Sequence, residues 1–564
     1  MPRLILKPGS RPPWVGLAAA VWVQMAAGSG ATFPLYSAAL KSVLGFNQQQ
    51  VTILGVANDF GENVGLLPGY ACNKLPPWAV LLVGAVACFL GFGVLWLAVT
   101  ETVQGLPFWL LFLALVIATN GNSWFNTAVL VTNMRNFPLS RGTVGGLLKG
   151  YVGISGAAYT VLYSMMLSHS ASNLLLLLTV GVPILCLVVM YFVRPCTPSG
   201  EDSSEHVHFT FVLSTSILLA TYLLVTTIVS EVVSLTSVVK YVLLATMVVL
   251  LMSPLAIPIK MTFFRANSRR NSPLAGSSDN LIQEDSESTE KEPFLTHSSS
   301  ASYLGSLFDE DPTDMEILLA EGEGAVKKKR KPRRGEDFKF GEAFVKADFW
   351  LLWFVYFLGT GSGITVSNNL AQIGFAFGAK DTTIILCLFS FCNFIGRLTS
   401  GSISEHFVRS RTLPRTLWMG VAQFFMAITF LIFAISLKHT LYIATALLGI
   451  GTGFQFLSIS TVSELFGLKH FGINFNFILL GNPIGATIFS AVLAGHVYDM
   501  EAEKQGSQTC IGPDCFRLTF LVLAGACGLG TLLSIILTVR IRPVYQALYA
   551  SGSFRLPHTS SSDH

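Results

Sequence analysis

Long apolar stretches separated by short polar segments dominate the chain. A helix needs about 20 predominantly apolar residues to cross a hydrocarbon layer about 30 Å thick. Fourteen such stretches occur, near residues 14–37, 48–71, 77–99, 107–133, 142–167, 173–193, 209–231, 236–258, 349–371, 382–403, 414–436, 440–465, 471–496 and 517–540. The pattern predicts an all-α membrane protein with about 14 transmembrane helices.

The spacing of these stretches divides the chain into five regions. They are a six-helix region at 1–200, two extra helices at 201–258, a polar gap at 259–345, a second six-helix region at 346–545, and a tail at 546–564. The gap is rich in Ser, Glu, Asp, Gly and Lys and has too few apolar residues to form a core, so we predict a disordered linker.

The charge content supports a membrane location. Charged residues make up 12% of the 564 residues, where a soluble domain has roughly 25%. Lys and Arg gather in the short loops on the side of the N-terminus, which predicts that both termini and the linker are cytosolic. The net charge of +4 is small, so we expect no nucleic-acid partner. The basic block at 327–334 favours contact with anionic membrane lipid.

A weak internal repeat relates the two six-helix regions. Gly28-Ser29-Gly30 in the first helix corresponds to Gly361-Ser362-Gly363 in the ninth, at an offset of 333 residues. Three further matches occur in the same order at nearly the same offset. Two parallel six-helix repeats with a solute site between them are the layout of major facilitator transporters. The sequence therefore predicts the major facilitator fold, as two six-helix halves plus two extra helices.

The loop after the second helix of each half resembles the cytosolic gating motif of that superfamily. The candidate gating residues are Asn73, Lys74, Arg135, Arg397, Glu405 and Lys469. The first-half version departs from the motif, because Asn73 replaces Asp and Pro76 follows. Gating ion pairs and plain orientation signals account equally well for Arg135 and Lys469.

Longer motifs resemble the plant nodulin-like major facilitators, which include the nuclear fusion defective type. The motifs are NSWFNTAVLVT at 122–132, RNFP at 135–138, RGTVGGLLKG at 141–150, LLAEGEGAVK at 318–327 and SELFGLKHF at 463–471. The resemblance covers nearly the whole chain. It implies a plant membrane protein of the transporter superfamily, and it implies no particular substrate.

Ionisable side chains at membrane depth are expensive and are functional candidates by default. Asp59 and Glu62 are three residues apart in the second helix and share a face. Lys149 lies about 10 Å inside the cytosolic end of the fifth helix. One interpretation makes Asp59 or Glu62 a proton-coupling carboxylate and Lys149 a site for an anionic solute. The alternative is that these charges pair with each other and touch no solute.

Polar residues in the first helix of each half and in the fourth helix of the first half are candidates for contact with the solute. These residues are Ser29, Thr32, Tyr36, Asn122 and Asn126 in the first half, and Ser362, Asn368 and Asn369 in the second. Glycine-interrupted helices at matching positions point to a binding site in transporters of this type. The alternative for the glycines is that they only permit close helix packing.

Other motifs bear on covalent structure and trafficking. Cys510 and Cys515 lie in the last extracytosolic loop, where oxidising conditions favour a short disulfide. No spacing typical of metal ligands or a catalytic group occurs, so we expect no metal, no cofactor and no enzyme activity. Asp314, Leu318 and Leu319 match an acidic dileucine pattern that sorting adaptors bind.

These observations favour a proton-coupled secondary transporter of a small organic anion or neutral metabolite. The rival interpretation is a non-transporting receptor or regulator with a transporter-like fold, motivated by the departures at Asn73 and Pro76. The sequence leaves the membrane open between the plasma membrane and an endomembrane such as the vacuole or the endoplasmic reticulum.

Overall fold

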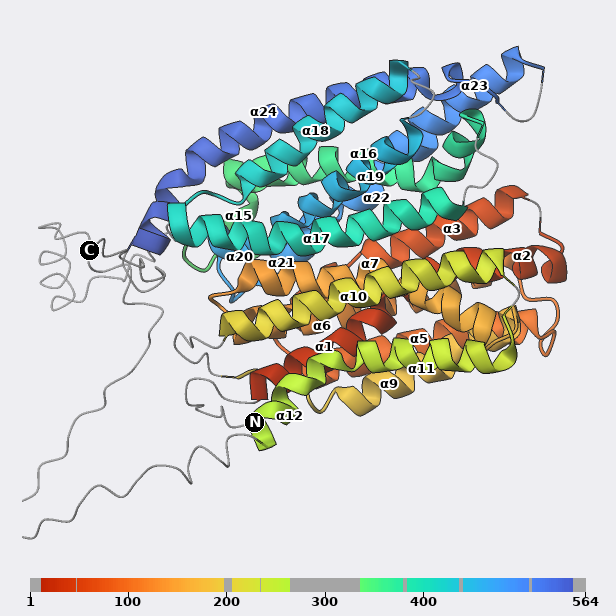
Figure 1. Ribbon diagram of the computed structural model, residues 1–564, viewed down its shortest axis with the longest axis horizontal. Coiled ribbons are helices and arrows are strands. Elements are labelled where there is room, and N and C mark those ends of the chain that lie inside the picture. Colours follow the sequence, from red (N-terminus) through yellow and green to blue (C-terminus); the bar gives the residue numbers. More distant parts are fainter. Residues whose placement is uncertain are drawn as a thin grey trace, which may run out of the picture. The chain divides into compact units, whose positions relative to one another are not determined.

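The computed structural model describes residues 12–46, 48–196, 205–233, 235–263, 335–378, 383–435, 440–506 and 510–550, and all regular structure in these ranges is helical. Its helices up to residue 259 and from 335 onward belong to one compact unit. The chain forms two six-helix halves, which are confirmed as a major facilitator fold by the comparisons given below (Figure 1).

The first half contains α1 (Pro12–Ala27), η1 (Ser29–Thr32), α2 (Phe33–Leu44), α3 (Gln48–Asn63), α4 (Leu66–Ala71), α5 (Pro77–Val99), α6 (Phe108–Asn136), α7 (Arg141–Met165), α8 (Ala171–Leu176), η2 (Leu177–Gly181) and α9 (Val182–Val189). Two extra membrane segments follow, as α10 (Glu205–Val232) and the group α11 (Ser237–Leu251), η3 (Ser253–Leu255) and α12 (Ala256–Phe263).

The second half begins with the short α15 (Phe340–Phe344) and continues with α16 (Ala347–Ala376), α17 (Thr383–Arg411), α18 (Thr416–Ile435), α19 (Leu441–Phe454), η5 (Gln455–Leu457), α20 (Ser458–Phe466), α21 (Phe471–Leu479), α22 (Gly481–Gly485), η6 (Ala486–Gly495), α23 (His496–Lys504) and α24 (Asp514–Ala550). α1 begins and α24 ends at the same end of the bundle (Figure 1).

Eleven helices of the described chain are long and apolar enough to cross a membrane, or twelve if the pair Ser237–Leu251 and Ser253–Phe263, bent by 41°, is one span. Each of the fourteen predicted segments contains helix. The number of helices that are long and apolar enough to span a membrane is nevertheless lower than the fourteen expected. The two segments that fall short are 48–71, which is broken between α3 and α4, and 142–167, which is α7. Both carry ionisable residues and glycines, and these lower their mean hydropathy.

The Gly-Ser-Gly runs of the two halves fold differently. In the first half the run ends α1 and becomes the 3-10 turn η1, whereas α16 continues unbroken through Gly361-Ser362-Gly363. The difference follows from Pro34, which has no N–H to donate to the carbonyl of Gly30. The side-chain amide of Asn58 donates to that carbonyl instead, at 3.2 Å.

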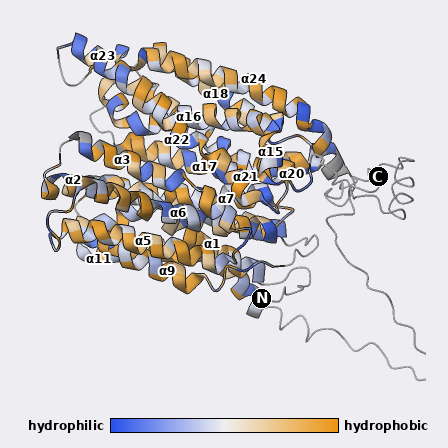
Figure 2. Ribbon diagram, turned by 180° about the vertical axis from the view of Figure 1, so that it is seen from behind, coloured by the Kyte–Doolittle hydropathy of each residue, from blue (hydrophilic) through white to orange (hydrophobic). Residues whose placement is uncertain are grey.

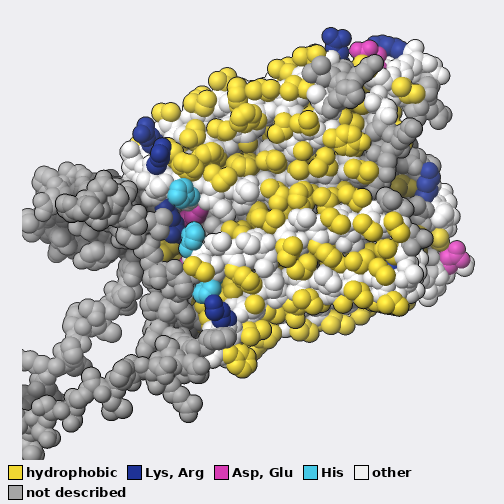
Figure 3. All heavy atoms as spheres, in the orientation of Figure 1, with side chains coloured by type: hydrophobic (Ala, Val, Ile, Leu, Met, Phe, Trp, Pro, Cys, Tyr) yellow, Lys and Arg dark blue, Asp and Glu magenta, His cyan; other side chains and the backbone are white. Residues whose placement is uncertain are grey.

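The outer surface of the helix bundle is apolar. On the face that Figure 3 shows, hydrophobic side chains cover the middle of the molecule, and Lys, Arg, Asp and Glu side chains appear near its two ends. The hydropathy colours of the ribbon show that hydrophobic residues also predominate along the helices seen from behind (Figure 2). Large apolar residues such as Leu67, Trp109, Ile443 and Val539 are each more than 60% exposed. A surface of this kind is stable only in a hydrocarbon environment. The chain is therefore an integral multi-pass membrane protein.

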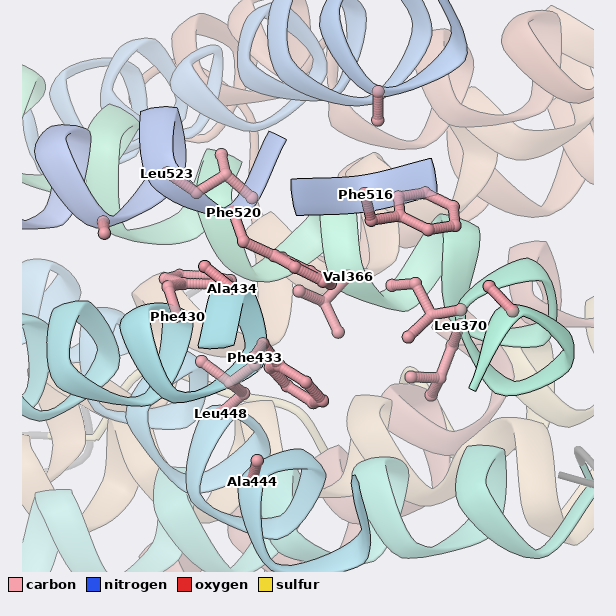
Figure 4. Packing of buried hydrophobic residues seen from close by; sticks show 14 of the residues in the cluster. Val366, Leu370, Phe430, Phe433, Ala434, Ala444, Leu448, Phe516, Phe520 and Leu523 are labelled. Atoms are coloured by element: carbon pink, nitrogen blue, oxygen red, sulfur yellow. The ribbon is translucent and has the colours of Figure 1, made fainter. Parts of the chain in front are cut away.

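The second half encloses an aromatic core between α16, α18 and α24 (Figure 4). Phe433 stacks on Phe520 with ring centroids 5.0 Å apart, and both rings are buried. Val366 and Leu370 of α16 belong to the same cluster. Since lipid is as apolar as these side chains, the cluster stabilises the half through close packing rather than through removal from water.

The first extra helix lies against both halves. α10 packs on α7 of the first half and on α17 of the second. Tyr151 of α7 and Ser216 of α10 share a hydrogen bond of 2.8 Å. Ser140, just before α7, donates to Glu205 at the start of α10.

At the opposite end of the second half, Cys510 and Cys515 are joined in a disulfide with their Cα atoms 5.8 Å apart.

We predict that Gly485→Ala destabilises the protein, because a Cβ there would lie 2.6 Å from the Cα of Gly361, where α22 crosses α16. Overpacking of this kind costs about 1–3 kcal/mol. Gly525→Ala is the matched control: its Cβ would meet no atom within 4 Å, and alanine stabilises a helix by about 0.5–1 kcal/mol relative to glycine. Apparent Tm values in detergent should fall for the first variant and not for the second. Equal Tm values would contradict the close crossing.

Candidate functional site

The two halves meet along a seam formed by α7 with α17 and by α4 with α21. Glycines allow the helix backbones to approach there. A Cβ on Gly401 would lie 2.4 Å from the carbonyl oxygen of Gly142, and a Cβ on Gly69 would lie 2.6 Å from that of Gly472. The close approach brings side chains of one half within reach of backbone groups of the other.

At the predicted cytosolic end, the carboxylate of Glu405 joins the halves. It accepts hydrogen bonds from the backbone N–H of Gly142 at 3.0 Å and from Arg415 at 2.8 Å. Arg415 is fully buried and also pairs with Glu464 at 2.8 Å. Arg409 donates to Glu405 within its own helix and to the carbonyl of Leu139 in the other half. The network holds the seam closed through charge-assisted bonds.

Two further arginines reach across the same end. Arg135 donates to the carbonyls of Leu468 and Lys469, at 3.0 and 3.1 Å. Arg141 donates to the carbonyl of Ser463 at 3.0 Å. Arg135 and Lys469, both predicted gating residues, therefore meet through the backbone carbonyl of Lys469.

Closer to the middle of the bundle, amide side chains join the halves. Asn476 donates to Thr127 at 3.0 Å, and Asn482 donates to Asn63 at 2.8 Å. Gly65 leaves room for Asn476, since a Cβ there would lie 2.0 Å from its oxygen. These contacts, together with those at the predicted cytosolic end, close the seam from that end to about the middle. Asp59 lies one helical turn beyond Asn63 and is exposed.

Two cations lie at the inner limit of these contacts. Arg397, in the middle of α17, donates to the carbonyl of Lys149 in α7 at 2.8 Å. The Arg397 guanidinium carbon lies 4.0 Å from the ring centroid of Phe456, and the Lys149 ammonium nitrogen lies 5.9 Å from the same centroid. Lys149 also lies 5.6 Å from the centroid of Phe475. The two halves thus contribute one cation each to one aromatic cluster.

A carboxylate and several amides face this region from the first half. Glu62 packs against Gly30, where a Cβ would lie 2.3 Å from its Oε2 atom and 3.6 Å from the amide nitrogen of Asn122. Ser29 donates to the oxygen of Asn122 at 2.8 Å. The break at η1 therefore brings Ser29, Glu62 and Asn122 together. Among the described residues, neither Asp59 nor Glu62 is within ion-pair distance of Lys149.

The other predicted contact residues are not all part of this group. Asn126 accepts from Gln24 at 3.2 Å, Thr32 donates to the Ser29 carbonyl at 2.6 Å, and Tyr36 is buried. Ser362 donates back into its own helix, to Leu358, and Asn369 donates to Ser490 within the second half, whereas Asn368 is exposed. The two Gly-Ser-Gly runs thus do not present matching polar groups.

The predicted gating residues Asn73 and Lys74 do not take part in the seam contacts described above. Lys74 lies over the ring of Tyr70, 4.6 Å from its centroid, and the Asn73 side-chain oxygen is buried with no partner among the described residues. The sorting pattern at Asp314, Leu318 and Leu319 lies outside the described residues, as does the basic block at 327–334.

Sequence reasoning missed several residues of the site. Phe456 and Phe475 look like ordinary core aromatics in apolar helices, and no local signal separates them from the rest. Asn474, Asn476 and Asn482 were detectable, because three amides in one apolar segment are unusual at membrane depth. Arg397 was assigned to the cytosolic gate, whereas it lies at the midpoint of a 29-residue helix.

The arrangement of two six-helix halves is that of the major facilitator superfamily. The proton:xylose symporter XylE aligns over 92% of this chain and 94% of its own at 10% identity and a TM-score of 0.50. The Escherichia coli fucose:proton symporter FucP aligns over 93% and 98%, at 13% identity and a TM-score of 0.47. At this level of identity, the likeness to XylE shows the fold alone.

The chain belongs to the nodulin-like family. The Nodulin-like family model matches residues 13–259, and the model described as NFD4, C-terminal domain, matches residues 340–547. The chain is 31% identical over 557 residues to Protein NUCLEAR FUSION DEFECTIVE 4 of Arabidopsis thaliana, covering 95% of this chain and 90% of that protein. The resemblance inferred from the sequence motifs is confirmed.

We predict that Arg409→Ala loosens the closed end, because it removes the bonds from Arg409 to Glu405 and to the Leu139 carbonyl. A hydrogen bond to a charged group contributes about 1.5–3 kcal/mol, which corresponds to at least a tenfold change in an equilibrium. A cysteine placed at the buried Ser463 should then react about tenfold faster with a thiol reagent.

The matched control for this prediction is Arg411→Ala. Arg411 is exposed and lies two residues further along the same helix, and its side chain has no partner among the described residues. The labelling rate at Ser463→Cys should be unchanged in this background. Equal acceleration in both variants would show that loss of positive charge, and not the bonds across the seam, sets the rate.

Proposed function

We propose that this protein is a secondary transporter of a small solute that works by alternating access. The observation that carries the proposal is the cluster of Lys149, Arg397 and Glu62, drawn from both halves and located where the seam contacts end. Ionisable groups at membrane depth are retained at a cost of at least about 2.5 kcal/mol each, so a function must maintain them.

The seam contacts close the space between the halves at one end, and this arrangement favours an alternating-access mechanism. Contacts from the predicted cytosolic end to the middle block that path, and the exposed Asp59 and Asn368 lie beyond them. Rocking of the halves would break the Glu405–Gly142 and Arg409–Leu139 bonds and open the site to the other side. The bonds of the seam are few and polar, which suits an interface that must open and close repeatedly.

Coupling to a proton gradient is assigned to Glu62. Its carboxylate faces Gly30 and Asn122 inside the first half, whereas Asp59 is exposed one turn away. Burial favours the neutral form of a carboxylate and nearby cations favour its charged form, so the balance between the two forms can depend on whether a solute is bound to the cations. We propose Glu62 as the coupling group and Asp59 as a group on the entry path.

The orientation follows the positive residues. Arg135, Arg141, Arg409 and Arg411 lie at the end of the bundle where α1 begins and α24 ends, and we propose that this end is cytosolic. The extra helix α10 contacts both α7 and α17, and we propose that it moves with these helices when the seam opens.

A regulator without transport remains the rival, and the departure at Asn73 favours it, since Asn73 makes no contact across the seam described above. Reconstitution separates the two. Purified protein in liposomes, with an imposed proton gradient and a metabolite mixture outside, should enrich at least one solute as measured by mass spectrometry. No enrichment from folded and correctly oriented protein would contradict the transporter proposal.

We predict that Glu62→Gln abolishes gradient-driven accumulation of that solute and retains its exchange between equal pools, because the amide keeps the shape of the carboxylate and cannot be ionised. Asp59→Asn should reduce both processes and abolish neither. Glu503→Gln is the control, since Glu503 is exposed at the end of α23 and its side chain has no partner among the described residues. Unchanged accumulation in Glu62→Gln would exclude Glu62 as the coupling group.

A further inference from the structure

Three hydrogen-bond donors around the ring of Phe456 lack acceptors. Lys149 has an exposed fraction of 7% and is therefore 93% buried. Its ammonium group donates to no described residue. The Nε atom of Arg397 and the hydroxyl group of Tyr356 are buried and likewise have no partner among the described residues. The donors come from three helices, α7, α17 and α16, and therefore from both halves.

All three donor groups lie close to the aromatic ring of Phe456. The Phe456 centroid lies 4.0 Å from the Arg397 guanidinium carbon, 5.9 Å from the Lys149 ammonium nitrogen and 6.3 Å from the ring centroid of Tyr356. Among the described residues, the Arg397 side chain donates one hydrogen bond, from Nη1 to the carbonyl of Lys149, and this bond holds its guanidinium group beside the Lys149 backbone. The three donors thus surround one small region.

Buried donors without acceptors are costly, and buried cations without counter-ions more so. The carboxylate of Glu62 neutralises at most one of the two positive charges, so the cluster keeps a net charge of +1. The Glu62 carboxylate also lies beyond ion-pair distance from Lys149. Such a cluster is completed by a ligand that brings one negative charge and several acceptor lone pairs. A carboxylate has both, and its two oxygens match the fork of a guanidinium group.

We propose that the carboxylate of a small organic acid binds between Arg397 and Lys149, with the hydroxyl group of Tyr356 donating to it. The rings of Phe456 and Phe475 provide apolar contact for its carbon skeleton. The proposal rests on the transporter function proposed above, because it names the substrate class of the same site. Since the two cations belong to different halves, a bound carboxylate draws the halves together at the middle of the membrane.

Binding can be tested without transport. Purified full-length protein in detergent is heated with pyruvate, malate or acetate, with acetamide as a neutral analogue, and with chloride, sulfate or phosphate as inorganic anions. A ligand at 100 times its Kd stabilises by about 2.7 kcal/mol, which raises the Tm of a chain of this length by roughly 2 °C. We expect such a rise with at least one organic acid, and none with acetamide.

Variants assign the effect to the cluster. Lys149→Met and Arg397→Gln should each abolish the ligand-induced rise in Tm, whereas Lys149→Arg should retain part of it. Arg411→Gln, at an exposed position of the same helix as Arg397, should leave it unchanged. Without ligand, the Tm of Lys149→Met should not fall, because the variant removes a buried charge that has no counter-ion. A purely structural lysine would instead lower the Tm of the ligand-free protein.

The outcomes separate this inference from the proposed function. A rise with inorganic anions equal to that with organic acids, or one that survives in Lys149→Met and Arg397→Gln, would overturn the carboxylate site. Uptake of a neutral solute that is insensitive to both variants would overturn it too and leave the transporter standing. Binding of an organic acid that depends on both cations, in a protein that moves no solute in liposomes, would support the site and contradict transport.

Discussion

A polar group in the hydrocarbon region must find its partner inside the protein, and this constraint organises the molecule. Many buried polar side chains of the described residues meet it locally, by donating to a carbonyl one turn back in their own helix, as Thr132 and Ser362 do. The others meet it across helices, and where they do so across the two halves they define the seam. Asn476 with Thr127 and Asn482 with Asn63 are examples. The donors around Phe456 are among the buried polar groups that find no partner within the described residues, and the proposed solute would supply an acceptor for them.

The seam combines two properties that a gate needs. Glycines at positions 142, 146 and 401 let α7 and α17 approach until backbone meets backbone, so closure is sterically specific. The attraction across the closed end comes from a few charge-assisted bonds around Glu405 and Arg409, so opening has a limited cost. Arg415 and Glu464 hold Glu405 in place from within the second half, and Tyr545 donates to Glu464.

The two halves have diverged in ways that their folds make visible. Pro34 breaks the first helix at a position where the second half has Ser367, and the break places Gly30 against Glu62. The carboxylate and the lysine of the site therefore belong to the first half, while the arginine and the aromatic ring come from the second. The extra helix α10 adds a contact to each half along the same seam. A symmetric scaffold thus carries an asymmetric site.

The sequence by itself determined the helices, the two halves and the family, because membrane insertion depends on local hydropathy and the repeat is written in the order of residues. It also indicated that Asp59, Glu62 and Lys149 are unusual, because a charge in an apolar segment is a local feature. Only the tertiary structure decided which charges meet. Arg397 and Lys149 are 248 residues apart, and Arg397 seemed part of a loop motif until the packing of α17 on α7 placed it mid-helix at the seam. Tyr356 and Phe456 have no local signature at all, since an aromatic residue in an apolar helix acquires its role from what long-range packing brings beside it.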